Sequence, residues 1–264
     1  MAGISIDILE QSEAVARHFN SINDYDTCSQ HVVPDNETIQ ETVYKISLDY
    51  LSYEDNKMKA VDLGLGTAHG ASLFLLNNEN ALLTGIDFSS KMLDKAKRNL
   101  SANDLLARTK IVNQDFTKEM NYKDVDIVFS TIAIHNATDE GKQKLFRNIF
   151  RMLKPGGLFV NGDFVHSESD SGQRSWERYY REYMKRYLSG GELEAWMRHA
   201  FVEDKPARLS DQQEWLYSAG FSEFGVISEG RRETPNFSLG SEAVGDFLSI
   251  HNQSSIIFSF WSAQ

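Results

Sequence analysis

Three acidic residues each end an apolar run of the chain: Asp62, Asp87 and Asp115. Asp87 lies 25 residues after Asp62, close to the spacing of about 20 residues expected of a carboxylate that binds ribose hydroxyls. A carboxylate suits that task because both of its oxygens accept hydrogen bonds. One acid at a strand end fits an ordinary loop, but three in succession indicate a shared ligand site.

A glycine-rich turn follows the first of these acids. Gly64 and Gly66 allow a sharp turn and a close approach of the backbone to a ligand. A helix-compatible segment begins at Thr67, so the N–H groups of its first turn face the same ligand. A dinucleotide-binding loop would carry its third glycine at position 69, where this chain has His69. Asp62 beside the turn would repel a pyrophosphate, so the pattern favours a cationic ligand without phosphate, such as S-adenosylmethionine.

These segments resemble, in order, the motifs of class I S-adenosylmethionine-dependent methyltransferases of the small-molecule type. The resemblance covers roughly residues 55–165 and rests on five blocks: residues 61–67, 85–93, 114–116, 126–135 and 153–157. It implies an α/β fold, a doubly wound three-layer sandwich with a mostly parallel seven-stranded sheet, an antiparallel C-terminal strand and a helical cap.

The hydrophobic pattern predicts alternating strands and helices, which is typical of a parallel sheet covered on both faces. Strands are expected near residues 58–63, 82–87, 108–113, 125–130 and 157–164, and helices near 8–20, 36–53, 67–77, 89–102, 139–153 and 191–200. A long helical stretch is expected after the polar segment 166–174. Residues 21–35 are expected to be a polar connection. Residues 203–229 predict a helix, a stop at Gly220 and a strand, and residues 256–261 predict the last strand, after an insertion at 230–255.

Four parts of the chain are expected. Residues 1–57 form an N-terminal helical cap segment, and residues 58–165 form the α/β core that binds S-adenosylmethionine. Residues 166–205 form a helical lid insertion, and residues 206–264 complete the sheet.

Composition narrows the classes of partner. The chain has 264 residues, 41% of them hydrophobic, and a net charge of −11, which disfavours a nucleic-acid substrate. A single cysteine, Cys28, excludes an intrachain disulfide, and no apolar run approaches the roughly 20 residues of a membrane span. We therefore expect a cytoplasmic protein with a small-molecule acceptor, no membrane partner, and a homodimer as one form of assembly.

The resemblance implies a set of cofactor-binding residues at the strand ends, in the glycine turn and in the N-terminal segment. Asp62 would balance the positive charge of the cofactor, Asp87 would bind the ribose, and Asp115 would accept the adenine amino group. The full set is Tyr25, His31, Asp62, Gly64, Gly66, Asp87, Phe88, Met92, Asp115, Phe116 and Ser130. For Phe88, Met92 and Phe116, which would flank the adenine, core packing is the alternative, and ordinary loop contacts are the alternative for Tyr25 and His31.

Catalysis is assigned to His135, which follows the fourth expected strand. Methyl transfer is mostly a matter of positioning, and a base is needed only where the acceptor must lose a proton. His135 could supply that base near neutral pH, or it could only hydrogen-bond the loop at residues 136–138. Asp163 and His166 are second candidates. No pair of residues has the spacing of a metal site, so no metal is expected.

Aromatic residues repeat at helical spacing after the core, at positions 176, 179, 180, 183 and 187. They would line an acceptor pocket for an aromatic or apolar molecule, or they would simply be core. A parallel stripe of basic residues at 174, 178, 181 and 185 is expected to be a solvated face that could alternatively receive an acceptor carboxylate.

The sequence therefore predicts an enzyme that transfers a methyl group from S-adenosylmethionine to an oxygen, nitrogen or carbon of a small molecule and releases S-adenosylhomocysteine. Two alternatives stay open: a tRNA-modifying enzyme or one that alters S-adenosylmethionine, and a catalytically silent partner subunit that binds the cofactor. His69 and Asp62 count against a nicotinamide dehydrogenase.

Overall fold

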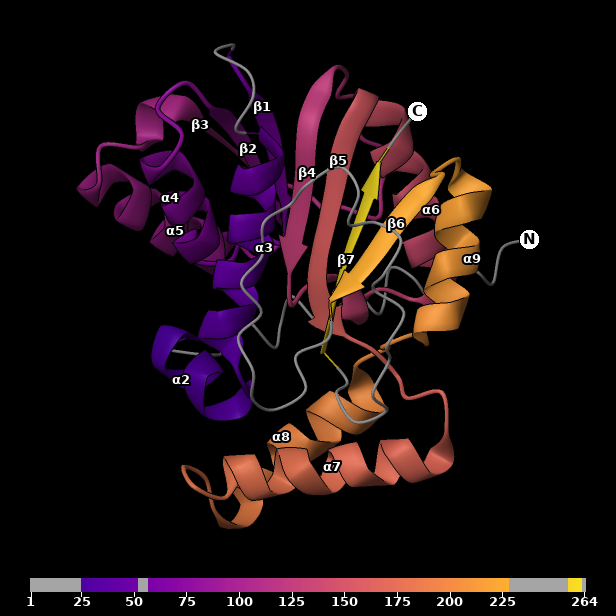
Figure 1. Cartoon of the computed structure of the whole chain (residues 1–264). Helices are drawn as coiled ribbons and strands as arrows, with labels where there is room; N and C mark the ends of the chain where they lie inside the picture. The colour runs from indigo at the N-terminus through magenta and orange to yellow at the C-terminus, as the bar shows by residue number, and fades with distance from the viewer. Residues whose placement is uncertain (1–24, 52–56, 228–255, 263–264) are drawn as a thin grey trace, which may run out of the picture.

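A central sheet with helices on both faces forms the core of the molecule (Figure 1). The computed structural model describes residues 25–51, 57–227 and 256–262. The strands are β1 (Lys59–Leu63), β2 (Leu82–Asp87), β3 (Thr109–Asn113), β4 (Val125–Thr131), β5 (Leu153–Phe164), β6 (Glu223–Ile227) and β7 (Ile256–Ser262). They lie in the order β3-β2-β1-β4-β5-β7-β6.

The first five strands pair in parallel, and β7 pairs antiparallel with β5 and β6. The predicted α/β architecture around a parallel sheet is confirmed. The strand order reverses at β1 and β4, and in sheets of this type ligands bind at the carboxyl ends of the strands at that reversal. Asp62, Gly64 and Gly66 are placed there by β1 and the turn that follows it.

The helices fill two layers and a cap. They are α2 (Tyr25–Val32), α3 (Asn36–Leu51), α4 (His69–Leu76), α5 (Ser90–Ala102), α6 (Asp139–Met152), α7 (Asp170–Met184), α8 (Gly190–Arg198) and α9 (Leu209–Ala219). Shorter helical segments cover Leu106–Arg108, Ile134–Asn136 and His199–Glu203. The helix expected at 8–20 and the insertion expected at 230–255 lie outside the described residues.

Each face of the sheet has its own apolar cluster. One cluster joins the sheet to α3, α4 and α5 and includes the buried side chains of Phe74 and Phe129. The other joins the sheet to α6 and α9 and includes Phe146 and Phe159. Such burial contributes roughly 1.5–3 kcal/mol for each large side chain. Because both faces of the sheet are buried, the strands are continuous apolar runs in the sequence.

Local signals explain where individual helices begin and end. Ser89 caps α5, because its hydroxyl accepts a hydrogen bond from the N–H of Met92 at 3.3 Å. The strand β5 begins four residues earlier than the expected position 157, at Leu153, which pairs with Val125 before the register shifts. Gly156, with φ 73°, lies in that irregular segment.

The helix α2 was expected to be a polar connection, and that expectation is wrong. Eight residues are too few for a stable isolated helix, so tertiary contacts hold it. The Tyr183 hydroxyl of α7 donates a hydrogen bond to the Gln30 carbonyl at 2.6 Å, and Ser29 and Val32 are buried. These contacts place α2 between the core and the cap formed by α7 and α8, which lie beyond the carboxyl ends of β4 and β5 (Figure 1).

Candidate active site

The glycine turn after β1 has a backbone that only glycine fits. Gly64 has φ 83°, and a Cβ added there would lie 2.3 Å from the Cβ of Ala133. Gly66 has φ 53°, and its N–H donates a hydrogen bond to the Asp87 carboxylate at 2.9 Å. From the other side the Ser130 hydroxyl donates to the Leu63 carbonyl at 2.7 Å. The turn is therefore held by β2 and β4 together.

Two carboxylates are buried next to this turn. Asp62 and Asp87 are 5% and 8% exposed. Burial, together with the charge of Asp87, raises the pKa of Asp62 to about 8. Burial also raises the pKa of Asp87, although hydrogen bonds from the backbone N–H groups of Ser89, Gly66 and Phe88 oppose that shift. Two buried acids that repel each other form a site that favours a cation.

A cavity of about 120 Å³, here termed the glycine-turn cavity, opens between the turn and α2. Of the predicted cofactor-binding residues, Tyr25, Asp62, Gly64 and Gly66 line it, and Asp87 lies directly behind Gly66. Tyr25 is partly buried, and the desolvation of its hydroxyl together with the nearby Asp87 carboxylate raises the pKa of that hydroxyl.

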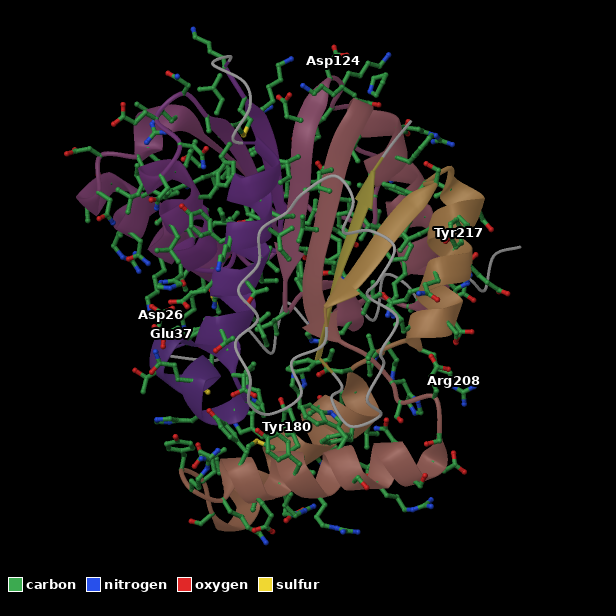
Figure 2. The ribbon with its side chains drawn as sticks, in the orientation of Figure 1. Asp26, Glu37, Asp124, Tyr180, Arg208 and Tyr217 are labelled. Carbon is green, nitrogen blue, oxygen red and sulfur yellow. The ribbon has the colours of Figure 1, made fainter. Side chains whose placement is uncertain are left out.

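Asp26 also lines this cavity and was missed from the sequence. Its carboxylate accepts a hydrogen bond from the Thr67 hydroxyl at 2.7 Å and pairs with the Lys95 ammonium at 2.7 Å. Asp26 thereby ties α2 to the glycine turn and to α5. It lies on α2 near Glu37 of α3, which lines the same cavity (Figure 2). No sequence signal marked Asp26, because its partners are more than 40 residues away.

The remaining predicted residues do not line the glycine-turn cavity: His31, Phe88, Met92, Asp115, Phe116 and Ser130. Phe116 is buried in the apolar cluster next to α6. Asp115 accepts hydrogen bonds from the Thr117 N–H and hydroxyl at 2.8 and 2.7 Å. His31 stacks on Tyr187 with 4.4 Å between ring centroids.

His135 is buried in a network of carboxylates after β4. Its Nδ1 lies 2.6 Å from an Asp163 oxygen, and its backbone N–H donates to the other oxygen at 2.9 Å. Its Nε2 lies 3.7 Å from an oxygen of Asp204. Burial lowers the pKa of His135, but the charges of Asp163 and Asp204 outweigh it, so the pKa lies above its usual value. The two residues that the sequence suggested for catalysis, His135 and Asp163, are thus hydrogen-bonded to each other.

The amide of Asn136 faces the same imidazole. Its Nδ2 lies 3.0 Å from His135 Nε2 and donates to the Ala133 carbonyl at 3.3 Å. Its Oδ1 is buried and has no hydrogen-bond partner among the described residues. Exchange of the amide oxygen and nitrogen would let Oδ1 accept a hydrogen bond from the Nε2–H of the charged imidazole. The orientation of Asn136 is therefore coupled to the protonation of His135.

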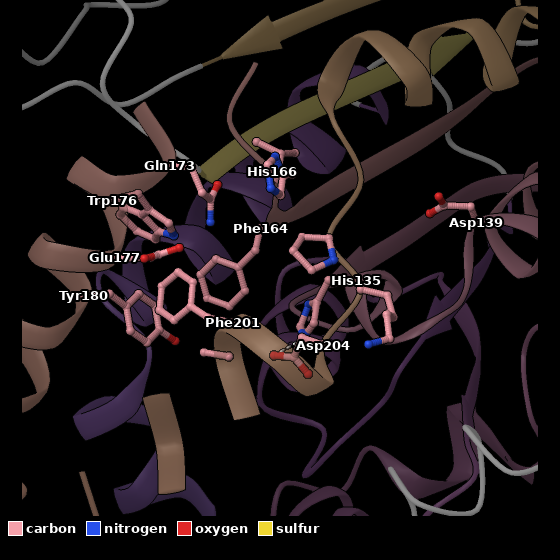
Figure 3. A pocket seen from close by; sticks show the side chains of 14 residues that line it. His135, Asp139, Phe164, His166, Gln173, Trp176, Glu177, Tyr180, Phe201 and Asp204 are labelled. Atoms are coloured by element: carbon pink, nitrogen blue, oxygen red, sulfur yellow. Dashed lines mark ion pairs between the residues drawn. The ribbon is translucent and has the colours of Figure 1, made fainter. Parts of the chain in front are cut away.

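A second cavity, of about 270 Å³, lies between the loop of His135 and α7; it is here termed the lid cavity. Figure 3 shows four rings, of Phe164, Trp176, Tyr180 and Phe201, gathered on one side of it, with His135 and Asp204 on the other. The predicted aromatic face of α7 is thus partly core and partly cavity wall. His166 also lines the cavity, and its Nδ1 donates to the Ser167 carbonyl at 2.9 Å. On the basic stripe, Arg181 pairs with Glu194 at the surface.

A buried lysine fixes the far side of the lid cavity. Lys142 of α6 is 1% exposed and donates hydrogen bonds to the carbonyls of Ala137, at 2.6 Å, and of Lys205. Burial lowers the pKa of Lys142. The backbone N–H of Lys205 also donates to the His135 carbonyl at 3.0 Å. These contacts dock the segment after α8 onto the loop that carries His135.

Comparisons with known proteins agree with this geometry. Residues 60–157 match a protein family described as "Methyltransferase domain". A phosphoethanolamine N-methyltransferase of Plasmodium falciparum is 29% identical over 145 residues, which cover 55% of this chain and 51% of that protein. A carboxy-S-adenosyl-L-methionine synthase of Shewanella piezotolerans is 27% identical over 178 residues, 66% of this chain and 72% of that protein. The chain thus spans about half the length of the first relative.

Among solved structures, the plantazolicin methyltransferase BpumL in complex with a triazolic desmethylPZN analog and SAH has a TM-score of 0.62 at 15% identity. The match covers 98% of this chain and 99% of that one. At this low sequence identity, the similarity shows only that the two chains share a fold. Residues 60–157 are thus similar to methyltransferase domains, and the whole chain shares the fold of a methyltransferase. The comparisons agree with the predicted resemblance, with the predicted enzyme class and with S-adenosylmethionine as the cofactor.

Within the described part of the chain, no helix combines the length and apolar character needed to cross a bilayer. In the same residues, no group of three His, Cys, Asp or Glu side chains is arranged to hold a metal ion.

Proposed function

We propose that the protein transfers the methyl group of S-adenosylmethionine to a nitrogen, oxygen or carbon of a small molecule and releases S-adenosylhomocysteine. The observation that carries this proposal is the pair of buried acids, Asp62 and Asp87, beside a turn that requires Gly64. A sulfonium and an ammonium supply the positive charge that such a pair favours.

The side chains fit the cofactor best at its amino-acid and ribose parts. Asp62, Gly64 and Tyr25 would hold the charged amino-acid part. The Asp87 carboxylate accepts backbone N–H groups from Gly66 at 2.9 Å, from Ser89 at 2.8 Å and from Phe88. Since a carboxylate has about four lone-pair sites, it retains capacity for a ribose hydroxyl. When bound, the cofactor supplies an electrophilic methyl carbon, whose bond to sulfur breaks with the electron pair left on sulfur.

The residues proposed to contact the adenine lie outside the glycine-turn cavity. Phe88, Met92, Asp115 and Phe116 keep their proposed roles only if the loops after β2 and β3 rearrange, since none of them lines the glycine-turn cavity. That cavity, at about 120 Å³, is also smaller than the roughly 300 Å³ at the low end for ligand pockets. We propose that α2 moves outward when the cofactor enters.

His135 would serve as a base for acceptors that must lose a proton. Asp163 orients the imidazole through Nδ1, which leaves Nε2 toward Asp204 and the lid cavity. Because the pKa of His135 is raised, the neutral form that accepts a proton becomes abundant only above the usual histidine range. Residues 166–205 would act as the lid over the acceptor.

Calorimetric titration with S-adenosylmethionine, S-adenosylhomocysteine and NADH tests the proposal. We expect the first two to bind and NADH not to bind. Asp87→Asn should weaken binding of S-adenosylhomocysteine by about tenfold or more, since a charged hydrogen bond contributes roughly 1.5–3 kcal/mol. Asp94→Asn, at an exposed position on α5, is the matched control. Binding of NADH alone, or equal affinities for the two variants, would contradict the proposal.

A second candidate is chemical alteration of the cofactor itself. It is favoured by the match to the carboxy-S-adenosyl-L-methionine synthase, which covers more of both proteins than the match to the phosphoethanolamine N-methyltransferase. Mass spectrometry of the cofactor recovered after incubation separates the two. Recovery of S-adenosylhomocysteine supports methyl transfer, whereas a modified S-adenosylmethionine supports the second candidate.

A further inference from the structure

The lid cavity combines aromatic rings with carboxylates, and this combination indicates what it binds. No residue that lines it also lines the glycine-turn cavity. The two are close, because Gln30 of the glycine-turn cavity accepts a hydrogen bond at 2.6 Å from Tyr183 of α7, the helix that also lines the lid cavity. Under the function proposed above, on which this inference rests, the lid cavity is the place for the methyl acceptor.

The aromatic wall is a rigid set of rings packed at steep angles. The ring centroid of Tyr180 lies 5.3 Å from that of Phe201, 6.0 Å from that of Phe164 and 5.4 Å from that of Trp176. The corresponding angles between ring planes are 90°, 76° and 69°. Edge-to-face packing of this kind holds each ring in place. The negative faces of such rings attract a cation within about 6 Å of a ring centroid, most strongly for Trp.

Carboxylates complete the wall. Glu177 and Asp204 both line the cavity, and the Asp204 side chain is 9% exposed. Lys205 also lines the cavity, and its ammonium donates to the Val202 carbonyl at 2.9 Å, while His199 Nε2 lies 3.5 Å from an Asp204 oxygen. His135 lies between Asp163 and Asp204, so its charge is offset by two acids. Figure 3 shows Glu177 on the same side of the cavity as Trp176 and Tyr180, from the same helix.

We propose that the lid cavity binds the acceptor as an organic ammonium ion, which makes the substrate a primary or secondary amine. An anionic acceptor would face Glu177 and Asp204, and a neutral one would leave the buried charge of Asp204 without a new partner. Before methyl transfer the bound ammonium gives one proton to neutral His135, whose imidazolium is held by Asp163 and Asp204, and the amine nitrogen regains its lone pair. That lone pair then forms the bond to the methyl carbon, the electron pair of the broken carbon–sulfur bond stays on sulfur, and the methylated amine leaves with the positive charge.

Binding of matched probes tests the charge preference without turnover. Each pair shares shape and differs in charge: choline against 3,3-dimethylbutan-1-ol, and benzylamine against benzyl alcohol. Their dissociation constants are measured by calorimetry and tryptophan fluorescence, with S-adenosylhomocysteine at saturation. We expect at least one cation to bind about tenfold more tightly than its neutral partner, the size expected of a partly desolvated cation–π contact.

Two substitutions on α7 locate the effect. Glu177→Gln keeps the shape of the side chain and removes its charge, so it should reduce the preference for the cation at least threefold. Glu182→Gln is the matched control, because Glu182 is exposed on the same helix and pairs with Lys185. Trp176→Leu, which removes a ring and keeps an apolar side chain, should weaken the cation more than the neutral probe.

The outcomes separate this inference from the proposed function. If S-adenosylhomocysteine binds but neither cation is preferred over its neutral partner, the amine inference is overturned and the methyltransferase proposal stands. If Glu177→Gln and Glu182→Gln behave alike, the site assigned to the cation is wrong. Failure of S-adenosylhomocysteine to bind contradicts the proposed function instead.

Discussion

The affinity for S-adenosylmethionine should rise steeply with pH, because Asp62 must ionise to balance the cofactor's charge. Burial raises the pKa of Asp62 to about 8, with the charge of Asp87 adding to the shift. At pH 7 only about one-tenth of the molecules then carry an ionised Asp62, and at pH 6 about one-hundredth. If the bound cofactor lowers this pKa below 6, the dissociation constant should fall about tenfold from pH 6 to 7 and about fivefold from pH 7 to 8.

The same shift predicts proton release. At pH 7 about 0.9 proton should leave the protein for each cofactor bound, since about nine-tenths of Asp62 is protonated beforehand. Calorimetry in buffers of different ionisation enthalpy counts these protons. Asp62→Asn cannot titrate at this position, so its affinity should be weaker at pH 8 and should lack the part of the pH dependence that Asp62 causes. Titration of the cofactor's own ammonium affects both proteins equally and cancels in their ratio.

Either of two results would refute this reasoning. One is an affinity of the unmodified protein that stays flat between pH 6 and 8 without proton release. The other is a pH dependence that persists unchanged in Asp62→Asn. In the free protein, a higher pH lowers the stability of the fold instead of favouring the functional state. The pKa of Asp62 is higher in the folded protein than its ordinary 3.8, so ionisation of this acid destabilises the fold as the pH rises toward 8. Asp62→Asn should therefore raise the melting temperature of the free protein at pH 8.

Three further predictions concern other groups. Gly64→Ala should lower the free energy of unfolding by about 2 kcal/mol or more, because φ is 83° and the new Cβ meets Ala133, whereas Gly191→Ala, with open space around it, should leave denaturant midpoints unchanged or slightly higher. Lys142→Met should cost roughly 1–3 kcal/mol by leaving two buried carbonyls without a donor, and Lys144→Met, exposed on the same helix, should cost little; equal losses would contradict the clamp. Because the pKa of His135 is raised in the folded protein, the charged imidazole stabilises the fold fully below pH 6.5, and this stabilisation is lost as the pH rises through the folded pKa. Loss of the same proton makes His135 a base, so the rate of methyl transfer to an acceptor that must lose a proton should increase above pH 6.5. In His135→Asn this increase of the rate with pH should be absent.

The core of the fold could be predicted because its signals are local. Each buried parallel strand is a continuous apolar run, and the acids at 62 and 87 mark strand ends directly. Ser89 caps its helix through a residue three positions away. Gly64 could be identified because its φ requires glycine whatever surrounds it.

The rest depends on contacts between distant segments. α2 is too short to show a helical period and is held by α7, more than 150 residues away. Asp204 follows a π-helical segment, and nothing near it in the sequence indicates that it faces His135. Phe116 illustrates the opposite error: an aromatic residue after a strand-end acid suggests a ligand contact, yet it packs against the α6 side of the sheet. Periodicity alone cannot distinguish these two fates.

The contacts of α2 have a consequence for the order of events during turnover. Asp26 ties this helix to Thr67 and Lys95 beside the glycine turn, and Gln30 ties it to Tyr183 of the cap. Under the proposed function α2 moves outward to admit the cofactor and then returns to its contact with Tyr183 of the cap, and such a movement would impose an order on binding. We expect steady-state kinetics of the ordered type, in which S-adenosylmethionine binds first and S-adenosylhomocysteine leaves last. Product inhibition by S-adenosylhomocysteine would then be competitive toward S-adenosylmethionine and noncompetitive toward the acceptor.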